Sequence, residues 1–230
     1  MWAVIFGVVL VGGSVTAFTT MGKNNGPKNP DNPEQLISTL LHPIVQNASA
    51  LGATKAKVTL IEFGDYQCQY CARFHRDTKD LIVNNFVNTG KINFMFKDFV
   101  INDRPSDKLS TLAAIGSYCA AEQGKYWPYY DEVYRNSKGE NTNWVSKNSL
   151  TQFAVYAGIS NVKKFSACLD SKKYENLVVT NDNLARSIGL TSTPTFILIA
   201  DGQPPLKIEG AQPYSVFEGA IGQVLRQIPS

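Results

Sequence analysis

Apolar and polar positions in residues 58–100 follow first a strand pattern, then a helical pattern, then a strand pattern again. Val58–Phe63 (VTLIEF) is a short β-branched and apolar run, which is typical of a buried strand. Residues 91–100 (KINFMFKDFV) alternate as a second strand. Between them, apolar side chains recur at helical spacing: Phe74, Leu81, Ile82 and Phe86. This order predicts a βαβ unit with a right-handed crossover.

The next part of the chain, from Pro105 to about Gly189, has helical patterns separated by polar turns. The patterns predict helices over Asp107–Glu122, Trp127–Asn136, Lys147–Ala157, Val162–Asp170 and Lys172–Ile188. Strand character returns at Thr195–Ile199 and Leu206–Glu209, and an amphipathic helix follows over Tyr214–Gln227. The chain therefore predicts an α/β domain over residues 51–228 with a helical insertion at about residues 104–189.

The N-terminal segment is apolar, because residues 2–18 contain no charge. Its length of about 17 residues lies between that of a signal-peptide core and that of a membrane span. Val15-Thr16-Ala17 offers small residues for cleavage, whereas Lys23 and Lys28 follow the apolar run and no basic region precedes it. We expect residues 1–20 to be a signal peptide or a membrane anchor, with a buried core helix as the alternative.

A linker is expected after this segment. Residues 22–34 (GKNNGPKNPDNPE) are rich in Gly, Pro and Asn and predict a tether without regular structure. We expect residues 21–50 as a whole to be a linker and the folded part to begin near residue 50. Either form of the N-terminal segment would send this folded part across a membrane, which predicts an extracytoplasmic protein.

Composition narrows the class of protein. The 230 residues are 43% hydrophobic and 18% charged, with a net charge of +3 and scattered Lys and Arg residues. This distribution argues against nucleic acid as a partner. The two histidines, His42 and His75, leave little for a metal site, and we expect neither a metal nor another cofactor.

The main chemical motif is the C-x-x-C formed by Cys68 and Cys71, because it joins a buried-type strand to the first turn of a helix. At a helix N-terminus, unpaired amide groups and the helix dipole stabilise a thiolate. The pKa of Cys68 should therefore be lowered and its nucleophilicity raised. Cys71, one turn further in, is placed to resolve a mixed disulfide. We expect Cys68 to be exposed and Cys71 to lie closer to the core.

Three segments carry a resemblance to a known family. Residues 58–75 (VTLIEFGDYQCQYCARFH) resemble the active-site segment of DsbA-like thioredoxins. The resemblance continues through residues 118–127 (YCAAEQGKYW) and ends in residues 189–196 (GLTSTPTF). About 120 residues separate the C-x-x-C from the proline of the last segment, as in the DsbA arrangement with its inserted helical domain. The resemblance implies a thioredoxin fold.

The resemblance also implies roles for residues near the motif. The Thr193–Pro194 bond would be cis, would pack against the C-x-x-C, and would present the Thr193 backbone to a substrate strand; the alternative is a plain strand-initiating proline. Glu62 would handle the proton of Cys71, with a purely structural acid as an equal alternative. His75, four residues after Cys71, is expected to be a helix-surface histidine typical of the family, with a chemical role as the alternative.

Two departures from the family concern the redox potential. The dipeptide between the cysteines is Gln69-Tyr70 rather than the Pro-His of enterobacterial DsbA, and Thr193 stands where DsbA has valine. Gln69 and Tyr70 add no positive charge, so a very strongly oxidising potential is not expected. The direction of electron flow, as an oxidase or as a reductase, therefore stays open at this point.

Cys119 and Cys168 fall on separate predicted helices of the insertion. With Cys68 and Cys71 assigned to each other, a structural disulfide between Cys119 and Cys168 is the economical interpretation. Two buried free thiols are the alternative. A four-cysteine zinc site is disfavoured because such sites usually pair two closely spaced couples, and only one couple exists here.

We therefore expect a monomeric thiol–disulfide oxidoreductase that forms disulfides in exported proteins. It would be reoxidised by a membrane partner of the DsbB or vitamin K epoxide reductase type. A reductase or disulfide isomerase of the same fold is the first alternative, although the roughly 30 residues before residue 50 are too few for the dimerisation domain of known periplasmic isomerases. A thioredoxin-fold metal chaperone is the rival from another class. Such proteins usually carry a C-x-x-x-C and a distant histidine, which this chain lacks.

Overall fold

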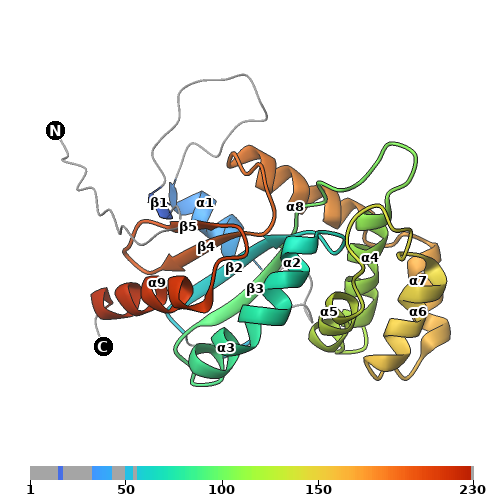
Figure 1. The fold of residues 1–230 in the computed structure, drawn as a ribbon, viewed down its shortest axis with the longest axis horizontal. Coiled ribbons are helices and arrows are strands. Elements are labelled where there is room, and N and C mark those ends of the chain that lie inside the picture. Colours follow the sequence, from blue (N-terminus) through green and yellow to red (C-terminus); the bar gives the residue numbers. More distant parts are fainter. Residues whose placement is uncertain (1–14, 18–32, 43–49, 54–55, 229–230) are drawn as a thin grey trace.

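The fold is built on a five-stranded mixed sheet, seen in a computed structural model that describes residues 15–17, 33–42, 50–53 and 56–228 (Figure 1). The strand order is β1-β5-β4-β2-β3. The strands are β1 (Val15–Ala17), β2 (Val58–Gly64), β3 (Asn93–Asp98), β4 (Thr195–Ala200) and β5 (Leu206–Glu209). Strands β2 to β5 lie where the sequence pattern predicts strands.

Strand β2 lies between a parallel neighbour, β3, and an antiparallel neighbour, β4. All seven of its residues are buried, as expected for a strand covered on both faces. Because side chains alternate along a strand, Leu60 and Glu62 point to one face, and Ile61 and Phe63 to the other. Glu62 therefore lies on the face of the sheet that is covered by the helix following the C-x-x-C.

One long helical unit follows the C-x-x-C and covers this face of the sheet. It begins with α2 (Gln69–Phe74) and α3 (Asp80–Ile82), between which lies the π-helical turn η1 (His75–Lys79), and it ends in a second π-helical turn, η2 (Val83–Val87). The C-terminal helix α9 (Tyr214–Gln227) lies beside it on the same face (Figure 1). Phe74 packs between Phe196 of β4 and Phe217 of α9, with ring centroids at 4.5 and 5.4 Å. Helix and sheet are therefore joined by aromatic packing.

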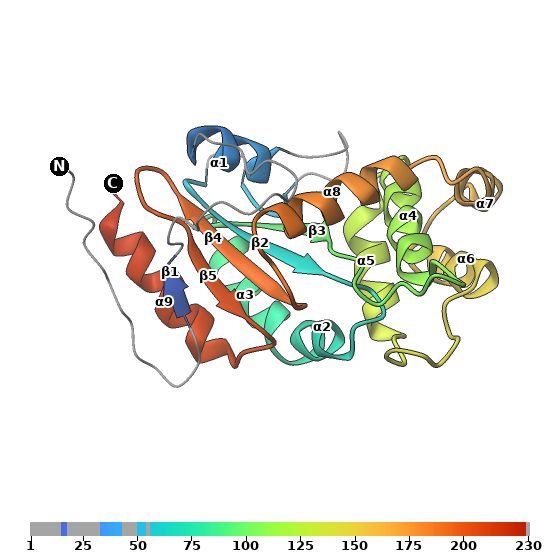
Figure 2. The same ribbon diagram turned by 90° about the horizontal axis from the view of Figure 1, so that it is seen from above.

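The helical insertion forms the other half of the molecule. Its helices are α4 (Leu109–Ala121), α5 (Tyr126–Arg135), α6 (Lys147–Tyr156), α7 (Val162–Asp170) and α8 (Glu175–Ser187). Helices α4 to α7 gather at one end of the sheet, and α8 returns along the face opposite α2 (Figure 2). The α/β fold with an inserted helical region is confirmed.

The N-terminal part contains a helix within residues 21–50, which we expected to be a linker. Helix α1 (Pro33–Leu41) packs against the sheet face that also carries α8. Leu36, Ile37, Leu40 and Leu41 form its apolar stripe, and Leu40 is 2% exposed. The Pro- and Asn-rich composition just before the helix concealed this pattern.

The predicted signal or anchor segment, residues 1–20, lies outside the described residues apart from β1. There the backbone pairs antiparallel with β5, with Val15 opposite Ile208 and Ala17 opposite Leu206. Within the parts of the chain that the structure describes, none of the helices has the length and apolar character needed to cross a membrane.

Candidate active site

The site begins at the turn that leads from β2 into α2. The Asp65 carboxylate accepts hydrogen bonds from the backbone amides of Gln67 (2.8 Å) and Asn102 (2.9 Å), and the Asp65 carbonyl accepts one from the amide of Cys68 (2.9 Å). Burial raises the pKa of the Asp65 carboxyl to about 7. This turn delivers Cys68 to the N-cap position of α2 in an extended conformation.

Cys68 is more enclosed than the sequence suggests, because it is only 3% exposed. Its Sγ lies 3.4 Å from the carbonyl oxygen of Thr193. Hydrogen bonding from the Cys71 side chain lowers the pKa of Cys68 to about 6, with further lowering by the Thr193 side chain and by the backbone amides of Cys71 and Tyr70, while burial opposes these effects. The sulfur at the start of the helix is therefore a stabilised thiolate at neutral pH.

The carbonyl that contacts Cys68 belongs to a cis peptide bond, Thr193–Pro194. Strand β4 begins at the next residue, Thr195, which lies opposite Phe63 near the end of β2. The Pro194 carbonyl accepts a hydrogen bond from the Gly210 amide at 2.8 Å. The sheet register thus holds this loop against the first turn of α2.

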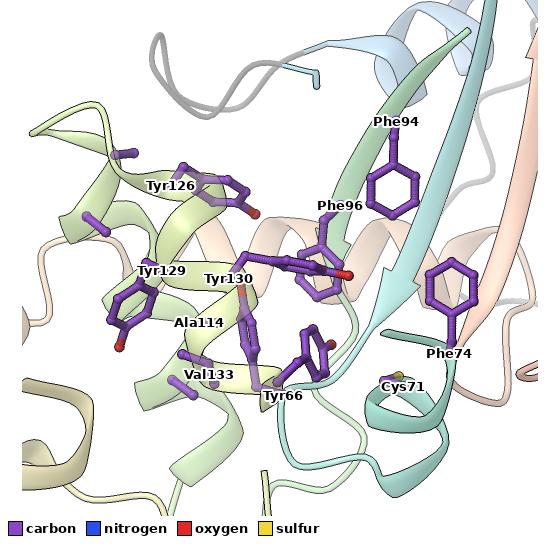
Figure 3. Packing of buried hydrophobic residues seen from close by; sticks show 14 of the residues in the cluster. Tyr66, Cys71, Phe74, Phe94, Phe96, Ala114, Tyr126, Tyr129, Tyr130 and Val133 are labelled. Carbon is purple, nitrogen blue, oxygen red and sulfur yellow. The ribbon is translucent and has the colours of Figure 1, made fainter. Parts of the chain in front are cut away.

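Cys71 has the opposite environment, although it lies only one turn away. It is fully buried, and Figure 3 shows it beside Phe74 on the side of α2 that faces the strands. Burial raises its pKa well above the ordinary value, and its hydrogen bond to Cys68 and the nearby charges of Cys68 and Glu62 act in the same direction. The two free thiols of this site therefore differ strongly in acidity.

Glu62 is a fully buried acid on the face of β2 that lies under α2. Its Oε2 accepts a hydrogen bond from the hydroxyl of Tyr130 at 2.8 Å, whereas its Oε1 is buried with no hydrogen-bond partner. Burial raises its pKa to about 8; the Cys68 charge adds to this, while Tyr130 and Lys79 oppose it. The carboxyl is thus protonated at neutral pH and has one oxygen free to act on a neighbour.

Helix α5 of the insertion contributes two rings, Tyr130 and Tyr134, to an aromatic wall behind Glu62. Tyr66, Phe96, Tyr130 and Tyr134 pack together there, and Figure 3 shows the first three between α5 and the strands. The centroid of the Tyr130 ring lies 5.2 Å from that of Phe96 and 4.9 Å from that of Tyr134. This aromatic wall excludes water from the Glu62 side of the site.

A partly buried ion-pair cluster lies next to this wall. Lys79 is 5% exposed, and its Nζ lies 2.5 Å from Oδ1 of Asp131. The Nε2 of His75 lies 3.0 Å from the same oxygen. The expectation of a helix-surface histidine is wrong, because the His75 side chain is 11% exposed and stacks on Tyr134. The insertion covers the face of the helix on which His75 lies.

The outer side of α2 is open to solvent. Gln69 is exposed, and Tyr70 is 49% exposed, with the Arg73 guanidinium 5.1 Å from its ring centroid. Arg73 also donates a hydrogen bond to the Ala211 carbonyl at 3.1 Å. A groove of about 570 Å³ runs here between α2 and the segment that precedes α9; its lining includes Arg73, Thr78, Ala211, Gln212 and Tyr214.

Cys119 and Cys168 are joined in a disulfide that links α4 to α7, with a Cα–Cα distance of 5.8 Å. Both residues are buried, at 1% and 7% exposure. This pair lies within the insertion and contributes nothing to the Cys68 site. Among the described residues, no group of three or more His, Cys, Asp or Glu side chains is arranged to hold a metal ion.

Several polar residues of the site were not candidates from the sequence: Asp65, Lys79, Tyr130, Asp131 and Glu140. Asp65 lies three residues before Cys68, and Lys79 lies eight residues after Cys71 on the helical unit that follows the motif. Proximity to the motif in the sequence could therefore have marked both. Tyr130 reaches Glu62 across 68 residues, and Glu140 reaches Gln69 across 71. A single sequence carries no signal for contacts of that separation.

Comparison with known proteins places the chain in a family. A family model described as thioredoxin matches residues 45–221. Disulfide bond formation protein D from Bacillus subtilis is 24% identical over 153 residues, which cover 66% of this chain and 68% of that protein.

Two solved structures show the same fold. The oxidised BdbD structure from Bacillus subtilis covers 80% of this chain and 96% of its own, with a TM-score of 0.70 and 22% identity. The alpha-DsbA1 structure from Wolbachia pipientis covers 83% and 96%, with a TM-score of 0.68 and 24% identity. Sequence motifs, fold and family match agree. The chain belongs to the thioredoxin family and is a DsbA-like, thioredoxin-fold disulfide oxidoreductase.

Proposed function

We propose that this protein is an extracytoplasmic thiol–disulfide oxidase that forms disulfides in exported proteins, with Cys68 as the reactive cysteine and Cys71 as its buried partner. One observation carries the proposal: the two cysteines have oppositely shifted pKa values beside a protonated, buried Glu62. This asymmetry gives each sulfur a different task in dithiol exchange.

The first step starts from the Cys68–Cys71 disulfide. A substrate thiolate attacks Sγ of Cys68, a substrate–Cys68 bond forms, and the Cys68–Cys71 bond breaks. The electron pair leaves on Cys71, whose sulfur is buried and has a raised pKa, so that it must take up a proton. Glu62 is the group placed to supply that proton, because its pKa of about 8 keeps it protonated at neutral pH.

The second step releases the product. A second substrate thiolate attacks the substrate sulfur of the mixed disulfide, and the electron pair leaves on Cys68. Thiols of low pKa leave faster in exchange, so the pKa of about 6 makes Cys68 the better leaving group. The substrate is oxidised by two electrons, and the enzyme retains them as one thiol and one thiolate.

The cis-proline loop would position the substrate. The Thr193 carbonyl lies 3.4 Å from the Cys68 sulfur, so an extended peptide that pairs with the backbone of this loop would bring its cysteine to Cys68. The groove next to Arg73 and Tyr214 would receive the neighbouring residues of such a peptide. Gln69 and Tyr70, exposed at the start of α2, would contact the same peptide.

Direction follows from the relative stability of thiolate and disulfide. Stabilising the Cys68 thiolate stabilises the reduced form and so raises the reduction potential. We expect a potential between those of thioredoxin and DsbA, roughly −270 to −120 mV. The relative from Bacillus subtilis is named for disulfide bond formation, which supports the oxidase direction. Reoxidation would come from a membrane redox partner of the DsbB or vitamin K epoxide reductase type.

The test combines a potential with an activity. The equilibrium of the Cys68/Cys71 couple is measured in a glutathione buffer, and reduced, unfolded ribonuclease is incubated with the oxidised protein. We expect a potential within the stated interval and recovery of ribonuclease activity. A potential at or below that of thioredoxin, without reactivation, would favour the reductase alternative.

A further inference from the structure

A loop of the helical insertion reaches the start of the active-site helix. It joins α5 to α6 and carries Glu140, whose Oε1 accepts a hydrogen bond from the backbone amide of Gln69 at 3.3 Å. Gly139 lies directly against the same residue, because a Cβ atom at Gly139 would stand 3.7 Å from Cβ of Gln69. The insertion therefore touches the residue that follows Cys68.

The loop is held in a defined shape. The indole Nε1 of Trp144 donates a hydrogen bond to the Gly139 carbonyl at 2.9 Å, and Trp144 is 7% exposed. Gly139, Asn141 and Asn143 all adopt left-handed backbone conformations, with φ angles of 77, 59 and 54°. These turns bring the chain from the end of α5 to α2 and back, and the buried Trp144 anchors the return. Glu140 is thus carried by a folded loop.

The Glu140 carboxylate and the Cys68 thiolate bind different backbone amides at the same end of α2. The first amides of a helix have no partner within the helix and form its positive end. The amides of Tyr70 and Cys71 stabilise the Cys68 sulfur, and the amide of Gln69 is bound by Glu140. Glu140 therefore occupies one amide of this helix end and brings a negative charge to the residue that follows Cys68.

We propose that Glu140 is a positioning residue that moderates the oxidising strength of the Cys68/Cys71 couple, through its hydrogen bond to Gln69 and its negative charge. Destabilising the Cys68 thiolate destabilises the reduced form and moves the equilibrium towards the disulfide. The helical insertion thereby sets the redox equilibrium of a site whose reacting atoms lie in the α/β domain. This inference rests on the proposed redox role of the cysteine pair.

The test is Glu140→Gln, which keeps an oxygen acceptor for the Gln69 amide and removes the charge. Two quantities are measured on the full chain: the thiolate absorbance of Cys68 against pH, and the equilibrium with reduced and oxidised glutathione. We expect the pKa of Cys68 to fall and the equilibrium to shift about three- to tenfold towards the reduced enzyme, which is roughly 15–30 mV more positive. High salt should shrink the difference, because Glu140 is partly exposed.

Two further variants make the result specific. Glu175→Gln removes the same charge from α8, where Glu175 pairs with Lys172 and not with α2, and it should change neither quantity. Trp144→Phe removes the indole hydrogen bond that holds the loop, and it should shift both quantities in the same direction as Glu140→Gln, by a smaller amount.

The outcomes separate this inference from the proposed function. No shift in Glu140→Gln, a shift of opposite sign, or an equal shift in Glu175→Gln would overturn the role of Glu140. Failure of the wild type to oxidise ribonuclease would instead count against the proposed function, and the Cys68 titration would still decide what Glu140 does.

Discussion

The two cysteine pairs of this molecule have opposite environments. Cys68 stands at the N-cap of α2, where free amides of the first turn reach its sulfur. Cys119 and Cys168 lie inside α4 and α7, where backbone amides are already used in helical hydrogen bonds. The first pair consists of free thiols with opposed pKa shifts, and the second is a disulfide that joins two helices.

The comparison shows that position along the helix, rather than spacing alone, decides what a cysteine can do. A thiolate gains stability where unpaired amides point at it, and a helix interior offers none. Glu62 adds to the difference, because it places an acid beside Cys71. The redox site is therefore assembled from strand, turn, helix start and cis-proline loop, whereas the second pair needs only two packed helices.

The largest effect should come from removing the reactive sulfurs. We expect Cys68→Ser to abolish oxidation of a dithiol peptide, because no other sulfur at the site has a lowered pKa. Cys71→Ser cannot form the enzyme disulfide; when it is mixed with the disulfide form of the peptide, it should accumulate mixed disulfides, because Cys68 attacks the peptide disulfide and no second enzyme sulfur is left to break the new bond. Mass spectrometry of the trapped complexes and the rate of peptide oxidation provide the measurement.

The matched control is the double variant Cys119→Ala/Cys168→Ala, which removes the other pair. It should retain peptide oxidation per folded molecule, because that disulfide lies outside the site. Normal turnover of Cys68→Ser, or loss of turnover in the folded double variant, would reverse the roles that we assign to the two pairs.

The next effect concerns stability. The Cys119–Cys168 bond spans 49 residues of sequence, and closing a loop of that length contributes roughly 4 kcal/mol in the chain-entropy model. We expect the double alanine variant to lose free energy of unfolding of that order in chemical denaturation. The Cys68–Cys71 disulfide closes only a very short loop, so its reduction should have a much smaller entropic effect. Equal losses for the two pairs would remove the distinction between a structural and a redox disulfide.

The architecture could be predicted because its signals are local. Val58–Phe63 and the helix Val162–Asp170 are continuous patterns with the periods of a strand and a helix, and the structure has both within one residue. The C-x-x-C was readable because a strand pattern ends and a helical pattern begins around it. Helix α1 was missed because its apolar stripe follows a Pro- and Asn-rich stretch.

The polar surroundings of the site could not be predicted, because they depend on how the insertion packs. Tyr130 and Glu140 lie on an insertion helix and on the loop that follows it, and their partners Glu62 and Gln69 lie in the α/β domain. His75 was misplaced for the same reason, since α5 covers a helix face that looks solvent-facing in isolation. Tertiary packing, rather than local propensity, decides these positions.

A smaller effect, confined to the redox pair, is expected for Glu62→Gln. If the acid supplies the proton that Cys71 takes up, the substitution should slow reduction of the enzyme disulfide by about a hundredfold, the low end of general acid–base effects. Stopped-flow reduction by a dithiol peptide measures this rate. A rate within a factor of two of the wild type would make Glu62 a structural acid only.

The same substitution changes the pH dependence of stability. Burial raises the pKa of Glu62 from 4.5 to about 8. At pH values between these two, Glu62 therefore holds a proton in the folded protein that it has lost in the unfolded chain. The free energy of unfolding therefore falls as the pH rises from about 5 to 8, by up to about 1.4 kcal/mol for each pH unit. Burial raises the pKa of Asp65 and Asp98 as well, which adds to the trend.

The oxidised enzyme is the form to measure. In the reduced enzyme the lowered pKa of Cys68 acts with opposite sign, because stability from a depressed acid is gained as the pH rises above about 6. Glu62→Gln should flatten the fall in stability of the oxidised protein between pH 5 and 8. An unchanged slope would show that Glu62 does not hold the extra proton.

The smallest effect concerns the hydroxyl that contacts this acid. Tyr130 donates a hydrogen bond to Glu62 at 2.8 Å, which stabilises the carboxylate and lowers a pKa that burial raises. Tyr130→Phe keeps the aromatic packing against Phe96 and removes the bond, so the pKa of Glu62 should rise further, by about one unit. In the oxidised protein, the upper end of the pH range over which stability is lost should move upward by the same amount, while the lower end, set by the unfolded chain, stays in place. Tyr129→Phe is the matched control, because it is the same change on α5 at a hydroxyl that is buried without a hydrogen-bond partner. Identical pH curves for the two variants would show that the Tyr130 hydroxyl does not set the acidity of Glu62, and that the insertion closes this side of the site by packing alone.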